Sequence, residues 1–279
     1  MSEDTPEKNT GVVTDAAKAI AAITENVPVY EDAVQPAAKE LGKGLEIVAK
    51  AVTTALAPVE GMIWGVDQVK NFVRSKVAQK LESTPTEDIQ PPKPSIGVPT
   101  VDALRYTGEE IDLAEMYANL LANSMDRATA YEAHPGFVDI IKNMSSDEAK
   151  VMSFLSRNLY YPLINIKAVN QENRSFRIIH RYVSLLGIDA GCDHPTLASN
   201  YIDNLSRLGI VNVSTTTKMH ENKNYSRIKE NKQIKSFIDS INQVEKQNVN
   251  FDEMRLEVTD LGRQFISVCI IDKRIKKRS

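Results

Sequence analysis

The chain has 279 residues, of which 42% are hydrophobic and 25% are charged. This length and apolar content are enough for one large or two modest domains with a substantial core. The formal net charge of −3 combines +5 in the last seven residues with −8 in residues 1–272, and an acidic body disfavours general nucleic-acid binding. The polar opening MSEDTPEKNT predicts no secretory leader, and Cys192 and Cys269 are expected as free thiols in a reducing cytoplasm.

The first long region, residues 10–84, follows a polar segment, residues 1–9, that is expected to be disordered. From Leu41 to Leu81 the apolar residues recur every three or four positions, which predicts one long amphipathic helix or two helices in register. Pro58 either bends one helix or separates two, because proline lacks an N–H donor.

The middle of this stripe, Ala51–Val66, has a single charge, Glu60, and small residues opposite the stripe. Two interpretations are open: the stripe is the core of an α-helical domain, or it contacts a partner or a membrane surface. It is too short to predict a membrane span, because a transmembrane helix needs about 20 predominantly apolar residues. The residues expected to make the membrane or partner contact are Leu45, Val48, Val52, Leu56, Val59, Ile63, Trp64 and Val66.

Five prolines fall within residues 85–100. They predict an extended linker between domains or subdomains, because such a segment is neither helix nor central strand. Residues 101–144 then form a predicted helical region. Thr107, spaced three residues before Glu110, is expected to cap a helix that runs to about residue 124.

Residues 145–272 show the order of elements that is typical of a winged-helix domain. Ser145 and Glu148 are spaced as a capping box for its first helix. The expected elements are helices at about 148–157, 177–186 and 195–208 (ended by Gly209), strands at 210–214 and 254–258, an insertion at about 215–252 with a helix at about 232–246, and a last helix opening at Thr259. The predicted fold is therefore mainly α, with long amphipathic helices, a helical middle region and a C-terminal winged-helix-like α+β module.

No familiar catalytic motif, such as GxSxG, HExxH or a phosphate-binding loop, occurs in the chain. Cys192 and His194 are spaced as two metal ligands, but a structural zinc site needs four. His134, before Pro135, is expected to be a turn residue rather than a base. We therefore predict no catalytic residues, no cofactor and no metal.

The winged-helix pattern raises the alternative of nucleic-acid binding. In the helix at 195–208 only Arg207 supplies positive charge, and Asp203 lies close to it. Neutralising phosphates needs several Lys or Arg side chains. The candidate contacts for nucleic acid or for a protein partner are Asn200, Arg207, Lys218, Lys223 and Arg227.

The basic tail, residues 273–279, has three open interpretations: a solvated end, a nucleic-acid contact, or attraction to an anionic membrane face. Near such a membrane each Lys or Arg contributes about 1 kcal/mol. The charged residues of the tail are Lys273, Arg274, Lys276, Lys277 and Arg278.

Residues from about Val29 to Phe154 resemble the abortive infection alpha domain, a bacterial family. The motifs that carry the resemblance are VYEDAVQPAAKELGKGL (29–45), LAPVEGMIWGVDQV (56–69), IQPPKPSIGVPTVDALRYTGEEIDLAEMYANLLANSMD (89–126) and AHPGFVDIIKNMSSDEAKVMSFL (133–155). The resemblance implies a role in antiphage defence, in which an infected cell halts or dies before phage progeny emerge. It brings no set of catalytic residues.

The resulting hypothesis is a defence protein that acts without catalysis, by membrane association or disruption through residues 37–81. The alternative is a soluble winged-helix regulator or sensor that binds a phage protein or nucleic acid, and an enzyme ranks third. The expected location is the cytoplasm, including the surface of the inner membrane. The expected partners are that membrane surface, a phage or host protein trigger and a second copy of the chain, with nucleic acid ranked below them.

Overall fold

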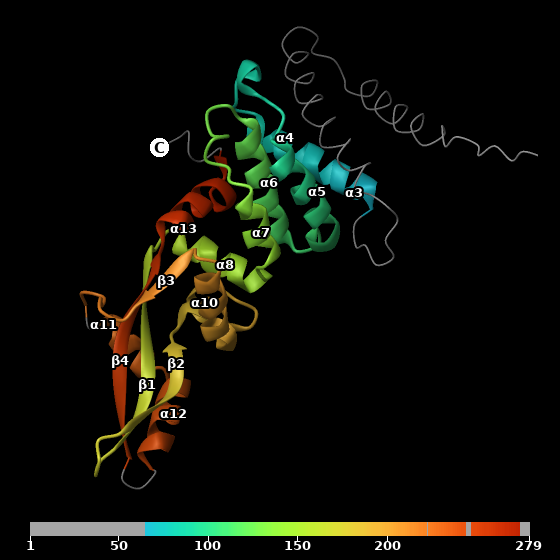
Figure 1. The fold of residues 1–279 in the computed structure, drawn as a ribbon. Coiled ribbons are helices and arrows are strands. Elements are labelled where there is room, and N and C mark those ends of the chain that lie inside the picture. Colours follow the sequence, from blue (N-terminus) through green and yellow to red (C-terminus); the bar gives the residue numbers. More distant parts are fainter. Residues whose placement is uncertain (1–64, 222, 244–246, 274–279) are drawn as a thin grey trace, which may run out of the picture.

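The computed structural model describes residues 65–221, 223–243 and 247–273, and its fold is α+β (Figure 1). A helical body at one end carries an antiparallel sheet that extends away from it as an arm. The helices before the sheet are α3 (Val66–Phe72), η1 (Val73–Val77), α4 (Ala78–Leu81), η2 (Thr86–Asp88), α5 (Pro94–Thr107), α6 (Ile111–Met125), α7 (Gly136–Lys142) and α8 (Ser146–Leu155). The later helices are α9 (Leu186–Asp189), η3 (Pro195–Leu197), α10 (Ala198–Arg207), α11 (Lys223–Lys229), α12 (Lys232–Asn242), α13 (Asp260–Phe265) and η4 (Ile266–Ile270).

Helix α6 forms the centre of the body, and residues 116–125 are all buried. A helix that is buried on every side needs apolar or small residues all round, and the sequence MYANLLANSM supplies them. Its two asparagines donate to carbonyl oxygens of η4. Asn119 Nδ2 lies 2.9 Å from the oxygen of Cys269, and Asn123 Nδ2 lies 2.9 Å from the oxygen of Val268. These hydrogen bonds attach the C-terminal helix to α6.

The apolar stripe predicted from the sequence continues through α3, η1 and α4. Val69, Val73, Val77 and Leu81 are buried and belong to the same core as α5 and α6. The predicted phase is therefore confirmed for residues 69–81, where the stripe is a core face of this chain.

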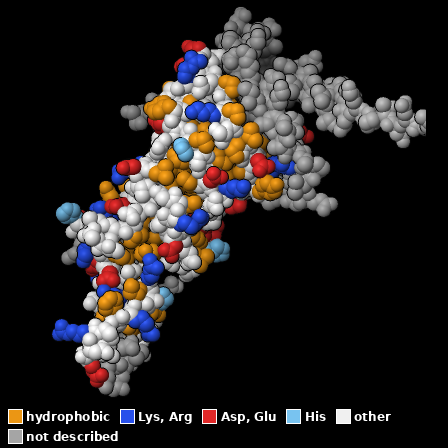
Figure 2. Space-filling view, in the orientation of Figure 1, with side chains coloured by type: hydrophobic (Ala, Val, Ile, Leu, Met, Phe, Trp, Pro, Cys, Tyr) orange, Lys and Arg blue, Asp and Glu red, His pale blue; other side chains and the backbone are white. Residues whose placement is uncertain are grey.

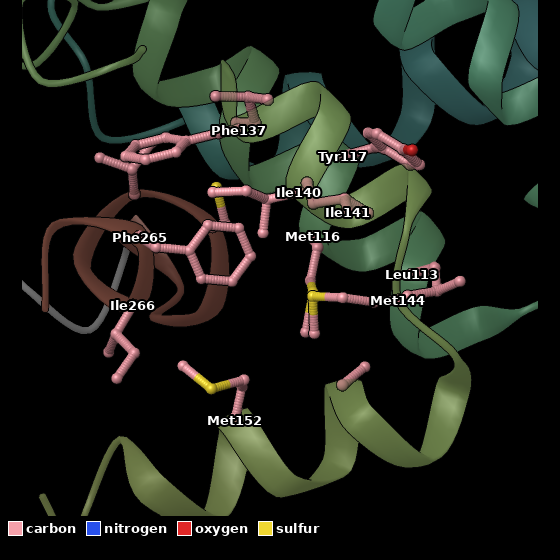
Figure 3. Packing of buried hydrophobic residues seen from close by; sticks show 14 of the residues in the cluster. Leu113, Met116, Tyr117, Phe137, Ile140, Ile141, Met144, Met152, Phe265 and Ile266 are labelled. Atoms are coloured by element: carbon pink, nitrogen blue, oxygen red, sulfur yellow. The ribbon is translucent and has the colours of Figure 1, made fainter. Parts of the chain in front are cut away.

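The C-terminal helix α13 and η4 close the body. The ring of Phe265 packs edge-on against that of Phe137 from α7, with ring centres 5.5 Å apart at 85°. Figure 3 shows Phe265 and Ile266 facing Ile140 and Met152. Edge-to-face aromatic pairs add to the stabilisation from burial, so the end of the described chain is an integral part of the core.

Four antiparallel strands form the sheet in the order β2-β1-β4-β3. They are β1 (Tyr160–Asn170), β2 (Phe176–Val183), β3 (Val211–Ser214) and β4 (Gln247–Val258). β1 and β4 pair from Tyr160 opposite Glu257 to Asn170 opposite Gln247, whereas β3 pairs only with the last part of β4. β2 therefore forms one edge of the sheet and the shorter β3 forms the other.

Strand β1 contributes side chains to two cores. Tyr161 and Leu163 join the core of the helical body. Ile164, Ile166 and Ala168 belong to a second cluster. The buried members of that cluster from α11 and α12 are Tyr225, Ile228 and Ile241. Because side chains alternate along a strand, these helices cover one face of the arm, as Figure 1 shows for α12.

The predictions of a mainly α fold and of a winged-helix module are wrong. The C-terminal part contains the four-stranded sheet, and the residues expected as a helix at about 177–186 form β2 instead. The sequence patterns above also do not predict β1. A hairpin turn joins these two strands: the N–H of Asn170 donates to the oxygen of Ser175 at 2.8 Å, and Asn170 Oδ1 accepts from the N–H of Glu172 at 2.8 Å. The β-branched and aromatic residues that flank this turn favour strands.

Other local predictions are confirmed. Ser145 and Glu148 form the expected capping box at the start of α8. Thr259 caps α13 with its side chain, and α12 forms where a helix was expected at about 232–246. Gly209, expected to end a helix, follows α10 with a left-handed φ of 76°, a conformation that glycine adopts without strain.

The proline-rich stretch does not stay extended. Helix α5 begins at Pro94, where a missing N–H costs little because the first helical N–H groups have no partner in the helix, and Pro99 lies inside it. Thr107 is the last residue of α5, so the predicted cap of α6 is wrong. The division into domains at residues 85–100 stays a prediction.

Candidate functional site

The predicted membrane or partner contact falls almost wholly outside the described residues. Leu45, Val48, Val52, Leu56, Val59, Ile63 and Trp64 lie outside, and Val66 is the first residue of α3. Among the residues that the structure describes, no helix combines the length and apolar character needed to cross a bilayer. The described part of the stripe, including Val73 and Val77, is buried in the body.

Lys273, the first residue of the basic tail, has a structural role. Its side chain is 2% exposed and its Nζ pairs with the carboxylate of Asp126. Asp126 also accepts from Thr84 Oγ1 at 3.0 Å and from the N–H of Ala128 at 2.8 Å. Burial by itself raises the pKa of Asp126, but the hydrogen bond from Lys273 and the other donors lower it overall. Four residues of the tail lie outside the described residues: Arg274, Lys276, Lys277 and Arg278.

The five candidates for nucleic-acid contact do not make one basic surface. Arg207 donates to Asn204 in its own helix α10, where Asn200 is exposed. The other three have a carboxylate neighbour, at N–O distances of 3.4 Å for Lys218 and Glu253, 2.6 Å for Lys223 and Glu221, and 2.6 Å for Arg227 and Asp189. Because these carboxylates offset the positive charge, they weaken the attraction to phosphates.

Asp189, at the end of α9, joins β1 to α11. Two nitrogens of Arg227 each lie 2.6 Å from its carboxylate, and the Tyr161 hydroxyl donates to it. Burial raises the pKa of Asp189, but the hydrogen bonds from Arg227 and Tyr161 and the charge of Arg227 lower it overall. Two hollows of about 610 and 230 Å³ adjoin this cluster, and Leu185 and Arg227 line both. Because both carboxylate oxygens are already bonded, the cluster serves to hold α11 against the sheet.

The sequence spacing of Cys192 and His194 has a structural explanation. Asp147, in the first turn of α8, accepts from the N–H groups of Asp193 at 2.7 Å and His194 at 2.9 Å and from the Tyr201 hydroxyl at 2.7 Å. Burial raises the pKa of Asp147, but these hydrogen bonds lower it to about 2. Burial raises the pKa of the Cys192 thiol to about 11, so little thiolate forms at neutral pH. In the described ranges no three His, Cys, Asp or Glu side chains are grouped to hold a metal.

Strand β2 is an edge of the sheet that is open along its first part, whereas its last residues, Tyr182 and Val183, are half-buried and α10 packs against the strand. It pairs with β1 on one side, and no other backbone of the described chain bonds along its outer side. Regular pairing with β1 holds from Phe176 to Ile178, and Tyr182 near the end has a left-handed φ of 54°. An edge strand leaves alternate N–H and C=O groups without a strand partner, so β2 offers backbone donors and acceptors to another segment.

The two faces of β2 carry different side chains. On the face of the sheet that points away from α12, Phe176 is 61% and Ile178 is 41% exposed. Lys167 Nζ lies 4.7 Å from the centre of the Phe176 ring. On the other face, Arg177 stands opposite Ala168, which belongs to the cluster beneath α11 and α12. Apolar and basic side chains therefore alternate along the first part of the strand.

The edge also concentrates positive charge. Residues 173–188 include Arg174, Arg177 and Arg181 and no Asp or Glu. All three arginines are exposed, and none of them pairs with a carboxylate of the described chain. Figure 2 shows blue Lys and Arg side chains beside orange hydrophobic ones along the arm. We name this surface the β2 edge, and its residues are Arg174, Phe176, Arg177, Ile178 and Arg181.

The sequence patterns above single out no residue of the β2 edge. The signal that identifies the strand is a turn rich in asparagine, at Asn170 and Asn173, followed by FRIIHRYV with its aromatic and β-branched residues. Helical spacing alone does not reveal this strand.

Comparison with known proteins identifies the family. A family model described as abortive infection alpha matches residues 65–269. The chain belongs to the abortive infection alpha family. The family assignment drawn from its motifs is thus confirmed. In this abortive infection alpha protein the match begins at residue 65, so the motif at 29–45 lies outside it, and it extends past residue 155 to include the whole sheet. Membership supports a role in abortive infection defence.

No curated protein matches the chain. Among solved structures, an uncharacterized protein from the hydrocarbon-degrading marine bacterium Alcanivorax borkumensis SK2 matches with 19% identity and a TM-score of 0.34, covering 51% of this chain and 94% of that one.

Proposed function

We propose that this abortive infection alpha protein acts in antiphage defence by binding another protein along the β2 edge, without converting a substrate. Membership of the family supports the defence role. The observation that supports binding is the open edge itself, where backbone groups of β2 lie between exposed apolar residues and arginines. In this proposal the protein acts by binding its partner and not by catalysing a reaction.

A comparison of the two edges of the sheet supports this assignment. An extended segment can add to an open edge through main-chain hydrogen bonds, while pockets beside alternate side chains give specificity. Edges that are not used for binding are commonly short or covered. β3 has four residues, and Val211 within it is buried in the core of the body. β2 has eight residues, and Phe176 and Ile178 remain exposed.

The described residues give less support to the two mechanisms expected from the sequence. The stripe of residues 69–81, which was a candidate for membrane contact, is buried against other helices of this chain. Membrane association through the rest of residues 37–81 stays a sequence-based prediction. Nucleic-acid binding is disfavoured because Lys218, Lys223 and Arg227 lie beside carboxylates.

Phage challenge of cells that produce edge variants tests the proposed function. Phe176→Ser combined with Ile178→Ser removes the apolar part of the β2 edge, and we expect protection to fall on the order of tenfold or more, because a few central apolar residues supply most of the binding energy at interfaces. The matched control is Ile111→Ser, which removes a 76% exposed apolar side chain at the start of α6, away from the arm. We expect this control to protect as well as the unmodified protein.

A photoreactive amino acid at Ser175, an exposed residue directly before β2, reports the contact itself. We expect a cross-link to another protein in infected cells that the double serine variant loses. The same group at Tyr131, which is 77% exposed in the body, should give no such cross-link. Full protection by the double serine variant together with no cross-link at Ser175 would overturn the proposed function.

A further inference from the structure

The positive charge of the β2 edge determines which kind of segment can bind there. Some exposed cations of the described chain have carboxylate neighbours, as Lys218 has in Glu253, whereas others, such as Lys142 and Arg157, have none. Arg177 and Arg181 have none among the described residues. On paired strands, opposite charges attract and like charges repel. A segment with carboxylates therefore supplies the counter-charge that the edge lacks.

The alternation of side chains along β2 adds a second requirement. A strand that pairs with β2 places its own side chains alternately on the two faces of the sheet. On one face its neighbours are Phe176 and Ile178, and the cation nearest to them, Lys167, is already paired with Asp252. On the other face its neighbour along the first part of β2 is Arg177, and further along the strand Ile179 and His180 pack towards α12. The matching segment therefore alternates apolar and acidic residues.

A second copy of this chain does not meet these requirements. Antiparallel pairing of two β2 strands would bring Arg177 and Arg181 of one copy next to those of the other, because the strand contains no acidic residue. Like charges on neighbouring strands oppose pairing, and charged edges are a known protection against edge-to-edge association.

We propose that the β2 edge binds an extended acidic segment of a partner protein, which adds to the sheet as a strand beside β2. Its apolar side chains lie next to Phe176 and Ile178, and its carboxylates lie next to the arginines. This inference rests on the proposed function and names the chemistry of its partner.

Binding of short peptides to the full-length protein tests the inference. The probe is a fluorescently labelled ten-residue peptide of alternating Val and Glu, and its counterpart has Lys in place of Glu. By fluorescence anisotropy we expect the Glu peptide to bind at least about tenfold more tightly than the Lys peptide, and to bind more weakly as salt is raised. Methylation of alternate backbone nitrogens on the Glu peptide removes donors to β2, and we expect it to abolish binding.

Charge reversal at the edge supplies the decisive variant. In Arg177→Glu combined with Arg181→Glu, we expect the Glu peptide to bind on the order of tenfold more weakly and the Lys peptide to gain affinity. A variant that had simply unfolded would gain affinity for neither peptide. The matched control reverses two exposed cations outside the edge, Arg207→Glu with Lys223→Glu, and should leave both affinities unchanged.

Three results would overturn the inference: equal binding of the two peptides, no effect of the edge variant, or dimerisation of the protein through β2 in sedimentation experiments. The two proposals fail in different ways. If the cross-link at Ser175 forms in infected cells but the Glu peptide does not bind, the acidic segment is wrong and the proposed function stands. If the double serine variant protects fully and no cross-link forms, the proposed function fails whatever the peptides do.

Discussion

The polar side chains in the buried part of helix α6 are hydrogen-bonded inside the protein, whereas the arginines of strand β2 face solvent. In α6, residues 116–125 are buried and two asparagine side chains donate to carbonyl groups of η4. In β2, arginine side chains face solvent without a carboxylate partner in the described chain. The polar groups of the helical body hold the fold together, whereas those of the arm remain available for contact with another molecule. Substitutions in the two regions should therefore have different consequences.

The largest loss of stability is expected at the buried pair of Asp126 and Lys273. Asp126→Asn removes the carboxylate that Lys273 contacts, and breaking a buried ion pair from one side costs about 3–5 kcal/mol of unfolding free energy. Chemical denaturation measures this loss.

An exposed ion pair serves as the control for that variant. The carboxylate of Asp67 is 93% exposed and lies 3.9 Å from Lys70, so Asp67→Asn should cost less than about 0.5 kcal/mol. The double variant Asp126→Asn with Lys273→Met should be more stable than Asp126→Asn alone, because it removes the buried charge. Equal losses at Asp126 and Asp67 would contradict the structural role of Lys273.

A smaller loss is expected where α6 meets η4. Asn123→Leu leaves the carbonyl oxygen of Val268 without its side-chain donor, and an unsatisfied buried polar group costs about 1–3 kcal/mol. The control is Asn143→Leu, since Asn143 is exposed at the C-terminal end of α7 and its side chain donates to the backbone oxygen of Asp139 in that helix. If both variants unfold at the same urea concentration, the contact between α6 and η4 is not what stabilises the body.

Asp147 makes the stability of the fold depend on pH. Its folded-state pKa of about 2 lies below the ordinary value of 3.8, so the unfolded chain takes up this proton more readily than the folded chain. The stabilisation is therefore complete above about pH 5 and is lost as pH falls towards 2. Urea unfolding should show that Asp147→Asn is most destabilising near pH 7 and less so in acid. A difference that stays constant down to pH 3 would contradict this assignment.

The smallest effect on stability is expected at the β2 edge. Arg177→Glu with Arg181→Glu alters exposed side chains that lack carboxylate partners in the described chain, and such surface changes shift the unfolding free energy by only about 0.5 kcal/mol or less. Thermal and urea unfolding measure it. A large loss would mean that these arginines stabilise the arm. It would contradict the conclusion that the polar groups of β2, unlike those of α6, are available for binding.

The sequence predicts the helical body better than the sheet, because helix signals are local. The spacing of Val73 and Val77 and the capping box at Ser145 are each visible within one or two turns. The residues of β2 fit either a helical or a strand spacing. What decides between them is pairing with β1, which in turn pairs with β4 far along the chain, as Ile166 does with Phe251. No short window of sequence contains that information.

The candidate site was beyond sequence reasoning for a related reason. Lys273 stands in a run of basic residues that reads as a solvated tail, yet its partner Asp126 lies 147 positions earlier. Arg227 reads as a free cation, yet Asp189 lies beside it in the fold. The arginines of β2 stand out only once the fold places them along one strand edge beside the exposed Phe176 and Ile178. Charge in a sequence shows which side chains are ionised, but burial and partners decide which of them face a ligand.

The hydrogen bonds from α6 to η4 also constrain how the protein is made. The ribosome delivers α6 early and η4 only after the entire sheet has been synthesised. Until then the surface of α6 that receives η4 has no cover from this segment, and exposed apolar surface on a nascent chain attracts chaperones and proteases. The body can therefore close only after residues 266–270 have been synthesised, so a chain cut short before residue 266 is expected to be degraded rather than to accumulate.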